Sequence, residues 1–271
     1  MLTRLIKTII EAFFPARCLA CGSFFHPKQQ PDNCLSENGF QSENVSFHTV
    51  MTPFLCPNCI TGFLSVEAPF CLRCGIMFKS REGDDHVCGE CLESPKRFRT
   101  ARASGVYDKA LRTTIHCLKY KGKIQLARPL GALLFSAFIS YWDINSIDII
   151  VPVPLHVKRF RRRGFNQAFL LIKDWDRIAK ALKVTLPGIQ IDGRLLVRSR
   201  WTKPQTGLGR KKRMANIKNA FSLNDSSKII DKRILLVDDV LTTGATADEC
   251  AKVLLYEGAR HVDVLTLARA V

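Results

Sequence analysis

Eight of the eleven cysteines in this 271-residue chain form four Cys-x-x-Cys pairs, all within the first hundred residues. Two thiolates at this spacing can bind one metal ion from a single tight turn, and two such turns complete a tetrahedral zinc site. We therefore predict two structural zinc sites, with the pairs combined in chain order. The first site takes Cys18, Cys21, Cys56 and Cys59, and the second takes Cys71, Cys74, Cys88 and Cys91.

The second site is the more strongly indicated, because only 13 residues separate its two pairs. Four thiolates leave no open position for water, so both ions are expected to stabilise a small domain and to take no part in chemistry. Disulfides or unliganded thiols are the alternative, and the lack of an export signal disfavours them. Cys117 and Cys250 lie among apolar residues of predicted helices and are expected to be core thiols.

Residues 22–55 separate the first two cysteine pairs and are rich in polar and turn-forming residues. We interpret them as an inserted loop that is partly disordered. Cys34 lies in this loop without a pairing partner in the Cys-x-x-Cys pattern. Cys34, His26, His48 and His86 could each replace a cysteine ligand, although a solvated side chain is the favoured interpretation for all four.

From about Arg99 onward the pattern changes to apolar strands that alternate with amphipathic helices. Strands are predicted at RASGVY, IDIIVPVPL, RILLVDD and HVDVLTLA, and helices at DKALRTTIHCLKY, IQLARPLGALLFSAFISYW, AFLLIKDWDRIAKALK and TADECAKVLLYEG. Continuous apolar strands between helices indicate a sheet that is buried on both faces. The predicted fold is therefore an α/β domain with a mostly parallel sheet, in which ligands bind beyond the carboxyl ends of the strands.

Two acids, Asp238 and Asp239, stand at that edge, directly after the apolar run RILLV. The turn VLTTGAT follows, in which Gly244 permits close backbone approach, and a helix is predicted from about Ala247. Backbone N–H groups at a helix start bind phosphate, and threonine hydroxyls are further donors. The acids can accept hydrogen bonds from sugar hydroxyls, directly or through a divalent cation. The stretch favours a ribose phosphate site over the alternative, a capped helix start with two solvated acids.

The segment ILLVDDVLTTGAT resembles the phosphoribosyl pyrophosphate (PRPP) signature of type I phosphoribosyltransferases. The segments LKYKGK, VPVPLH, RRRGFNQA, TKPQTGLGRKKRMANIKNAF and EGARHVDVLTLAR resemble the ComF family, and the four cysteine pairs resemble its double zinc ribbon. This resemblance covers nearly the whole chain and implies the type I phosphoribosyltransferase fold. It implies an amphipathic helix at 1–16, a double zinc ribbon at 17–98 that contains the inserted loop, and a phosphoribosyltransferase-like domain at 99–271.

The resemblance also implies roles for single residues. Asp238 and Asp239 are the expected catalytic pair, which contacts the ribose diol and stabilises the cationic sugar as pyrophosphate leaves. The PRPP-binding residues are expected to be Asp238, Asp239, Leu241, Thr242, Thr243, Gly244, Ala245 and Thr246. Mg²⁺ is expected to bind together with PRPP, and no residue is an evident nucleophile or base.

Two further segments are implied to contact the pyrophosphate. The turn after the strand IDIIVPVP and nearby cations are expected to contribute Val153, Pro154, Leu155, Lys119, Lys121 and Arg163. A hood between Arg198 and Arg213 is expected to contribute Lys203, Gln205 or Arg210. For each basic residue, a solvated side chain is an equally good interpretation.

The net charge of +17 is concentrated in one quarter of the chain, because residues 156–218 hold 18 lysines and arginines against 3 aspartates. Phe160 and Phe165 are interleaved with the cations, a combination that suits phosphate backbone and stacked bases. We therefore predict a polyanion partner, with single-stranded nucleic acid as the natural candidate. Cations that only surround PRPP are the rival explanation. The predicted nucleic-acid patch comprises Lys158, Arg159, Arg161, Arg162, Lys211, Lys212 and Arg213.

The first fourteen residues place apolar side chains on one face at helical spacing. The predicted helix docks on the protein itself, or alternatively on a membrane surface or a partner helix. No transmembrane segment is predicted, and the expected location is the cytoplasm. ComF relatives are associated with DNA uptake, so competence-machinery proteins are expected partners. The two hypotheses are a ComF-type protein that binds PRPP and single-stranded DNA in natural transformation, and a phosphoribosyltransferase of nucleotide metabolism with no nucleic-acid role.

Overall fold

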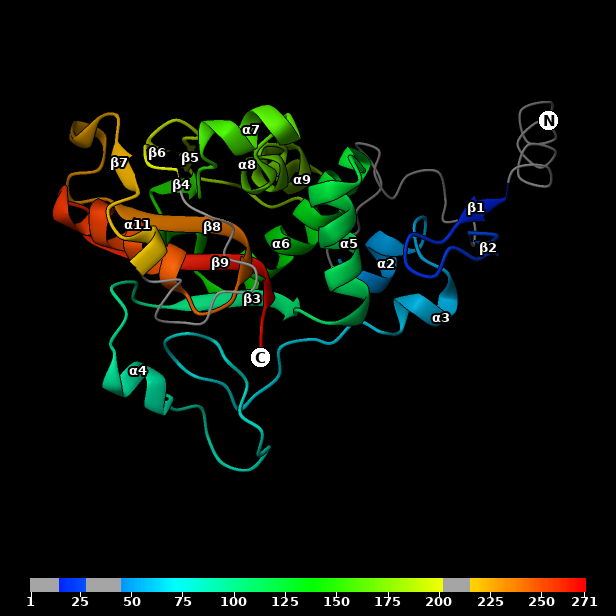
Figure 1. The fold of residues 1–271 in the computed structure, drawn as a ribbon. Coiled ribbons are helices and arrows are strands. Elements are labelled where there is room, and N and C mark those ends of the chain that lie inside the picture. Colours follow the sequence, from blue (N-terminus) through cyan, green and yellow to red (C-terminus); the bar gives the residue numbers. More distant parts are fainter. Residues whose placement is uncertain (1–14, 28–44, 202–214) are drawn as a thin grey trace.

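The computed structural model describes residues 15–27, 45–201 and 215–271 (Figure 1). Its centre is a five-stranded parallel sheet with the strand order β3-β9-β8-β4-β5. The strands are β3 (Ala101–Val106), β4 (Ile149–Pro152), β5 (Gln190–Ile191), β8 (Arg233–Leu241) and β9 (His261–Arg269). The predicted parallel α/β sheet is confirmed.

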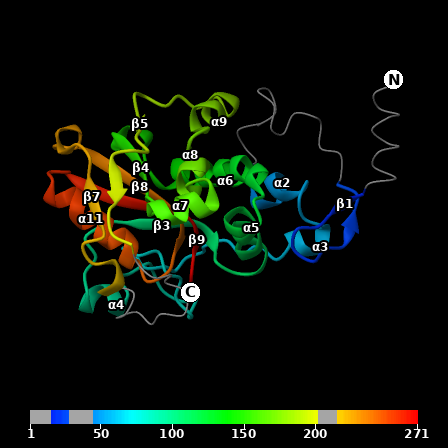
Figure 2. The same cartoon turned by 45° about the horizontal axis from the view of Figure 1, so that its top comes forward.

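Alternate residues of the central strands point to opposite faces of the sheet, and each face has its own apolar core. Leu235 and Val237 face one core, while Ile234 and Leu236 face the other. The first core is covered by α5 (Lys109–Tyr120), α6 (Ala127–Tyr141), α8 (Gln167–Ile172) and α9 (Trp175–Ala181). The second is covered by α11 (Ala245–Tyr256) and the antiparallel pair β6 (Leu196–Arg198) and β7 (Phe221–Leu223). Figures 1 and 2 show these two groups on opposite sides of the sheet.

Helix α6 is the central helix of the first core. Gly131 lets it approach α8 closely, since an added Cβ would lie 2.4 Å from the carbonyl oxygen of Leu171. Together with the short 3-10 helix η1 (Ile124–Leu126), α6 forms the one segment among the described residues that is long and apolar enough to cross a membrane. More than half of this segment is buried inside the protein, which is typical of the core helix of an α/β domain.

Two helices differ from the predicted elements. The helix predicted over AFLLIKDWDRIAKALK is divided into α8 and α9, so that Trp175 is fully buried and packs on Phe135 and Phe138. Helix α7 (Val157–Arg163) was not predicted, because it has no buried residue and therefore no apolar period. His156 begins α7, and Gly164 ends it in the left-handed conformation.

The expectation that residues 22–55 form a polar inserted loop is wrong for the part that the structure describes. The strands β1 (Ala16–Arg17) and β2 (Phe24–Phe25) form an antiparallel pair. Helix α2 (Phe47–Met51) begins with a capping box formed by Ser46 and Thr49. Its Phe47, Val50 and Met51 are buried in the first core of the sheet. Three apolar residues on one short helical turn produce little sequence signal, which explains the error.

The two cysteine-rich segments lie on different sides of the molecule. The short helix α3 (Pro57–Ile60) lies with α2 beside α5, whereas α4 (Gly89–Glu93) lies on the side of α11 (Figures 1 and 2). Cys18, Cys56 and Ile60 belong to the same apolar core as α5 and α6. The first cysteine-rich segment therefore shares its core with the sheet domain.

Candidate functional site

The carboxyl ends of β4 and β8 lie next to each other at the point where the strand order reverses. From β4 the chain leads outward to β5, and from β8 it leads in the opposite direction to β9. β4 ends at Pro152, which is paired with Val237, while β8 continues along β9 as far as Leu241. Beyond Val237, β8 therefore has a neighbour on one side only. Ligands of open α/β sheets bind at such a switch point.

Asp238 and Asp239 lie in this unaccompanied part of β8, inside the strand and not directly after it. Adjacent strand residues face opposite sides, so Asp239 lies on the α5 side and Asp238 on the α11 side. Asp239 is 4% exposed, and its Oδ1 is 2.7 Å from Nζ of Lys119 on α5. Its Oδ2 is buried and has no hydrogen-bond partner among the residues that the structure describes. A buried carboxylate oxygen without a donor is costly, and it marks a place for a ligand hydroxyl.

The charges around the two acids shift their ionisation. Burial and then the neighbouring Asp239 carboxylate raise the pKa of Asp238 to about 7, although the Asp239 backbone N–H donates to Asp238 Oδ1. Burial opposes the charge on Lys119, but the Asp239 carboxylate outweighs this effect and raises the pKa of Lys119. The arrangement is a buried cluster of two acids and one cation at the carboxyl edge of the sheet. Strongly shifted groups of this kind are typical of functional sites.

The threonine loop, residues 241–246, joins β8 to α11. Gly244 adopts the left-handed conformation with φ of +74°, which favours glycine. Helix α11 begins at Ala245, two residues earlier than predicted, so Thr246 lies in its first turn. Thr242, Thr243 and Thr246 are half-buried. The loop thus presents hydroxyls and the first N–H groups of a twelve-residue helix next to the two acids.

The turn after β4 is held by a residue that the sequence analysis did not single out. Val153 and Pro154 are buried and Leu155 is half-buried. The side-chain amide of Asn166 donates to the carbonyl oxygen of Val153 over 3.1 Å, and its Oδ1 accepts from the backbone of Ala168 at the start of α8. Asn directly before the apolar run QAFLLI is a helix-start signal, which would have identified this residue.

The expected cations have different positions. Lys119 reaches the acids, whereas Lys121 is exposed just beyond the end of α5. Arg163 pairs with Gln167 and lies 5.2 Å from the ring centre of Tyr120. Arg198 is a further neighbour of the acids that the sequence analysis missed. It is buried on β6, and its charge favours ionisation of Asp238. The expected hood residues Lys203, Gln205 and Arg210 lie outside the described residues.

Comparison with known proteins adds a second line of observation. Residues 175–270, which include both acids and the threonine loop, match the family described as phosphoribosyl transferase domain. Competence protein F of Haemophilus influenzae is 30% identical over 264 residues, which are 95% of this chain and 99% of that protein. The chain belongs to the ComF family. The DNA utilization protein YhgH of Escherichia coli K12 is 34% identical over 207 residues, covering 75% of this chain and 85% of YhgH. Competence protein ComFC of Streptococcus pneumoniae is 26% identical over 215 residues, covering 79% of this chain and 80% of ComFC.

The two cysteine clusters of this ComF chain are those predicted from the spacing, and in each the four sulfur atoms lie within 4.8 Å of one another. A zinc–sulfur bond of about 2.3 Å places the sulfurs of a tetrahedron about 3.8 Å apart. The distances Cys21 Sγ to Cys56 Sγ and Cys74 Sγ to Cys88 Sγ are both 3.8 Å. Both clusters therefore fit a metal ion. His26, His48 and His86 are not members of either cluster, and Cys34 lies outside the described residues.

In the second cluster, backbone N–H groups favour the ionised form of one thiol, Cys71. Burial opposes ionisation of Cys71, but the N–H groups of Cys88, Cys74 and Arg73 lower its pKa to about 7. The Cys74 and Cys88 N–H groups lie 3.4 and 3.3 Å from its sulfur. The other cysteines behave as expected, because Cys117 and Cys250 are buried in the two cores of the sheet domain.

A basic surface follows β4 in this ComF chain. Helix α7 exposes Lys158, Arg161 and Arg162, and Phe160 among them is 47% exposed. Trp201, which was not singled out, packs against this helix with Lys158 Nζ at 5.6 Å and Arg159 Cζ at 5.5 Å from its ring centre. The suggested stacking role does not suit Phe165, because it packs against the first core. Lys211, Lys212 and Arg213 lie outside the described residues.

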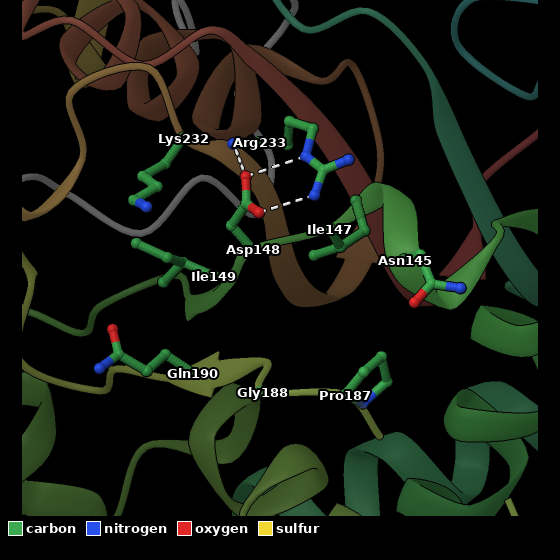
Figure 3. A pocket seen from close by; sticks show the side chains of 9 residues that line it. All are labelled: Asn145, Ile147, Asp148, Ile149, Pro187, Gly188, Gln190, Lys232 and Arg233. Atoms are coloured by element: carbon green, nitrogen blue, oxygen red, sulfur yellow. Dashed lines mark hydrogen bonds and ion pairs between the residues drawn. The ribbon is translucent and has the colours of Figure 1, made fainter. Parts of the chain in front are cut away.

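A pocket of about 460 Å³ lies at the opposite, amino-terminal edge of the sheet (Figure 3). It is lined by Asn145, Ile147, Asp148, Ile149, Pro187, Gly188, Gln190, Lys232 and Arg233. Arg233 forms a forked pair with Asp148 at 2.9 and 2.7 Å, which lowers the pKa of Asp148 to about 2. This pair ties the starts of β4 and β8 together and leaves neither charge without a partner. The carboxyl edge, where Asp238 and Asp239 lie, is therefore the candidate site.

Proposed function

We propose that this protein binds PRPP or a related phosphoribosyl ligand at the carboxyl ends of β4 and β8, binds single-stranded DNA on the α7 surface, and acts in DNA uptake. The observation that carries the ligand proposal is Asp239, a buried carboxylate with one oxygen on Lys119 and the other without a donor in residues 15–27, 45–201 and 215–271. The phosphoribosyl transferase domain match supports the ligand class. The relatives named for competence and DNA utilization support the process.

In this proposal the ribose hydroxyls donate to the carboxylates of Asp238 and Asp239. The 5′-phosphate accepts from the first N–H groups of α11 and from the threonine hydroxyls, where the positive end of the helix dipole attracts it. Mg²⁺ bound with PRPP would neutralise pyrophosphate charge, and carboxylate oxygens are ligands that suit it. The turn after β4, held by Asn166, follows the strand that pairs with β8 and is proposed to receive the pyrophosphate.

Calorimetric titration of PRPP in the presence of Mg²⁺ tests the ligand site. We expect Asp239→Asn to weaken binding by about tenfold or more, because it replaces a charged acceptor of hydrogen bonds. Asp231→Asn is the matched control. This substitution makes the same chemical change at an exposed residue, which pairs with Arg260. Equal affinities of Asp239→Asn and wild type, both folded, would overturn the assignment.

A second candidate is catalytic transfer of the phosphoribosyl group in nucleotide metabolism, with no nucleic-acid role. The two acids favour it, because carboxylates beside a bound sugar would stabilise the positive charge that develops as pyrophosphate leaves. The acids would then act by electrostatics and positioning. Release of pyrophosphate from PRPP in the presence of nucleobases or amines would support this candidate, provided that Asp239→Asn abolishes it.

We further propose that zinc is the ion of both clusters and that the protein works in the cytoplasm. Four thiolates are a typical structural zinc set, and a reducing compartment keeps them free of disulfides. The boundaries 1–16, 17–98 and 99–271 remain our proposed domain division. Peripheral membrane contact through residues 1–14 and partners in the competence machinery belong to the same proposal, and residues 1–14 lie outside the described ones.

A further inference from the structure

Arg269, the last residue of β9, joins the second cysteine cluster to the threonine loop. It is 6% exposed, and the hydrogen-bond partners of its guanidinium in the described part of the chain are carbonyl oxygens and one cysteine sulfur. On one side, Nε donates to the carbonyl of Cys74 over 3.0 Å, and Nη2 lies 3.8 Å from Cys74 Sγ. A cluster of four thiolates around a divalent ion carries two negative charges, which balance a buried guanidinium.

The other side of the same guanidinium orients the loop. Nη1 donates to the carbonyls of Leu241 over 3.2 Å and of Thr242 over 2.5 Å. In a trans peptide the C=O and the following N–H point in opposite directions. Carbonyls that turn toward Arg269 therefore turn the N–H groups of Thr242 and Thr243 away from it. Arg269 thus fixes the direction of donors that a bound phosphate needs.

A second contact ties the chain after the cluster to the same loop. Phe98 is fully buried, and its ring lies 3.6 Å from the position of a Cβ added to Gly244. The backbone N–H of Arg97 donates to Asp248 over 2.6 Å, and its guanidinium pairs with the same carboxylate. Asp248 lies in the first turn of α11. The chain that leaves the cluster therefore holds both the glycine of the loop and the start of the helix.

The first cluster has a different setting. Its elements lie beside α5, on the side of the molecule away from α11 (Figures 1 and 2). Leu19, next to Cys18, accepts weakly from Cys117 of α5, and its N–H donates to Phe54. No hydrogen bond between the first cluster and residues 241–246 occurs in the described ranges. It is therefore an internal control for the second cluster.

We infer that Arg269 is a positioning residue that couples metal binding at the second cluster to anion binding at the threonine loop. A metal-bound cluster holds Arg269 in place, and Arg269 holds the loop in the form that binds phosphate. Coupling of this kind is reciprocal, so the bound anion raises the affinity for the metal by the same factor by which the bound metal raises the affinity for the anion. The inference rests on the phosphate-binding role proposed above for residues 242–246.

Hydrogen exchange of the peptide that contains residues 242–246 tests the positioning role without any ligand. In the zinc-loaded protein we expect Arg269→Lys to speed exchange about tenfold, because one ammonium cannot bridge the two sides. Cys88→Ser should have the same effect, and Cys21→Ser should have none. Unchanged exchange in Arg269→Lys, or an equal effect of Cys21→Ser, would overturn the inference.

Zinc release to a chelator, counted by native mass spectrometry, tests the coupling. Ribose 5-phosphate is expected to slow zinc loss from the second cluster about tenfold in wild type and much less in Arg269→Lys. Equal retardation in both proteins would overturn the coupling. If ribose 5-phosphate fails to bind wild type at all, the proposed ligand site falls, while the exchange experiment still decides whether Arg269 positions the loop.

Discussion

At the scale of single residues, the pair of Lys119 and Asp239 has the largest energetic consequence. Their side chains are 16% and 5% exposed, so neither charge is well solvated. Removal of one partner leaves the other charge buried and uncompensated, which costs much more than the pair itself contributes. The unpaired oxygen of Asp239 adds to this cost in the protein without ligand. In the proposed function, a ligand hydroxyl supplies the donor that this oxygen lacks among the described residues.

We expect Lys119→Met to lower the free energy of unfolding by about 3–5 kcal/mol. The double variant Lys119→Met with Asp239→Asn should recover part of this loss, because it removes the stranded charge. Urea unfolding of both variants measures the effect. Arg260→Met breaks the exposed pair with Asp231 and should cost at most about 1 kcal/mol. Similar losses in Lys119→Met and Arg260→Met would contradict the buried character of the pair.

Asp238 makes the stability of the free protein depend on pH. Its pKa is raised from the ordinary 3.8 to about 7, so the folded protein holds a proton between these values that the unfolded chain has released. The contribution of Asp238 to the free energy of unfolding therefore falls as the pH rises from about 4 to about 7, and is constant above. We expect Asp238→Asn to remove this slope. Parallel curves of the free energy of unfolding against pH, for the variant and the wild type, would show that Asp238 ionises normally.

At the scale of elements, α7 carries a cationic surface and takes no part in the two apolar cores. It follows the turn after β4, has no buried residue, and carries four arginines and one lysine in seven residues. Aromatic contacts come from Phe160 on the helix and from Trp201 beside it. A short helix with this composition is stabilised by its capping residues, His156 and Gly164, and not by burial. Its role is therefore expected to lie in binding.

We expect the triple variant Lys158→Gln, Arg161→Gln and Arg162→Gln to weaken binding of single-stranded DNA. Because each phosphate contact contributes about 0.7 to the slope of log affinity against log salt, the slope should fall by about 2. Fluorescence anisotropy over a salt series measures it. The matched control changes Arg177, Lys180 and Lys183, which are exposed on and after α9. Equal slopes in the two triple variants would exclude α7 as the contact surface.

At the scale of the whole molecule, the two cysteine clusters are joined to the sheet domain in different ways. The first shares an apolar core with α2, α5 and α6. The second adds to the edge of the sheet, where the N–H of Ala101 on β3 donates to the carbonyl of Arg73 over 2.7 Å. Gly75 approaches the same strand so closely that a Cβ would lie 2.6 Å from the Ala101 carbonyl. Metal loss is therefore expected to affect different parts of the protein.

Elemental analysis of the purified protein is expected to find about two zinc ions per chain, one for each set of four thiolates. Cys88→Ser and Cys21→Ser should each reduce the content to about one, because three thiolates and a hydroxyl bind zinc far less tightly. A content of zero in wild type would contradict the zinc assignment. A loss of both ions in one single-site variant would contradict the independence of the clusters.

The sequence by itself determined the features that arise from near neighbours in the chain. Cys-x-x-Cys spacing identified the members of both clusters, and apolar runs identified β4, β8 and β9. The start of α11, which follows β8 and the threonine loop, was predicted to within two residues. In each case the structure depends on contacts a few residues apart, which leave a repeated pattern in the sequence.

The tertiary structure alone decided how distant residues meet. Lys119 joins Asp239 from another helix, and Arg269 reaches a cysteine 195 residues away in the chain. Helix α2 enters the first core, and Trp201 packs on α7. Such contacts follow from the packing of whole elements, which fixes burial and partners without leaving a period in the sequence. For that reason the chain indicated candidate residues for the site, while their pairing and their shifted pKa values were decided by the tertiary structure.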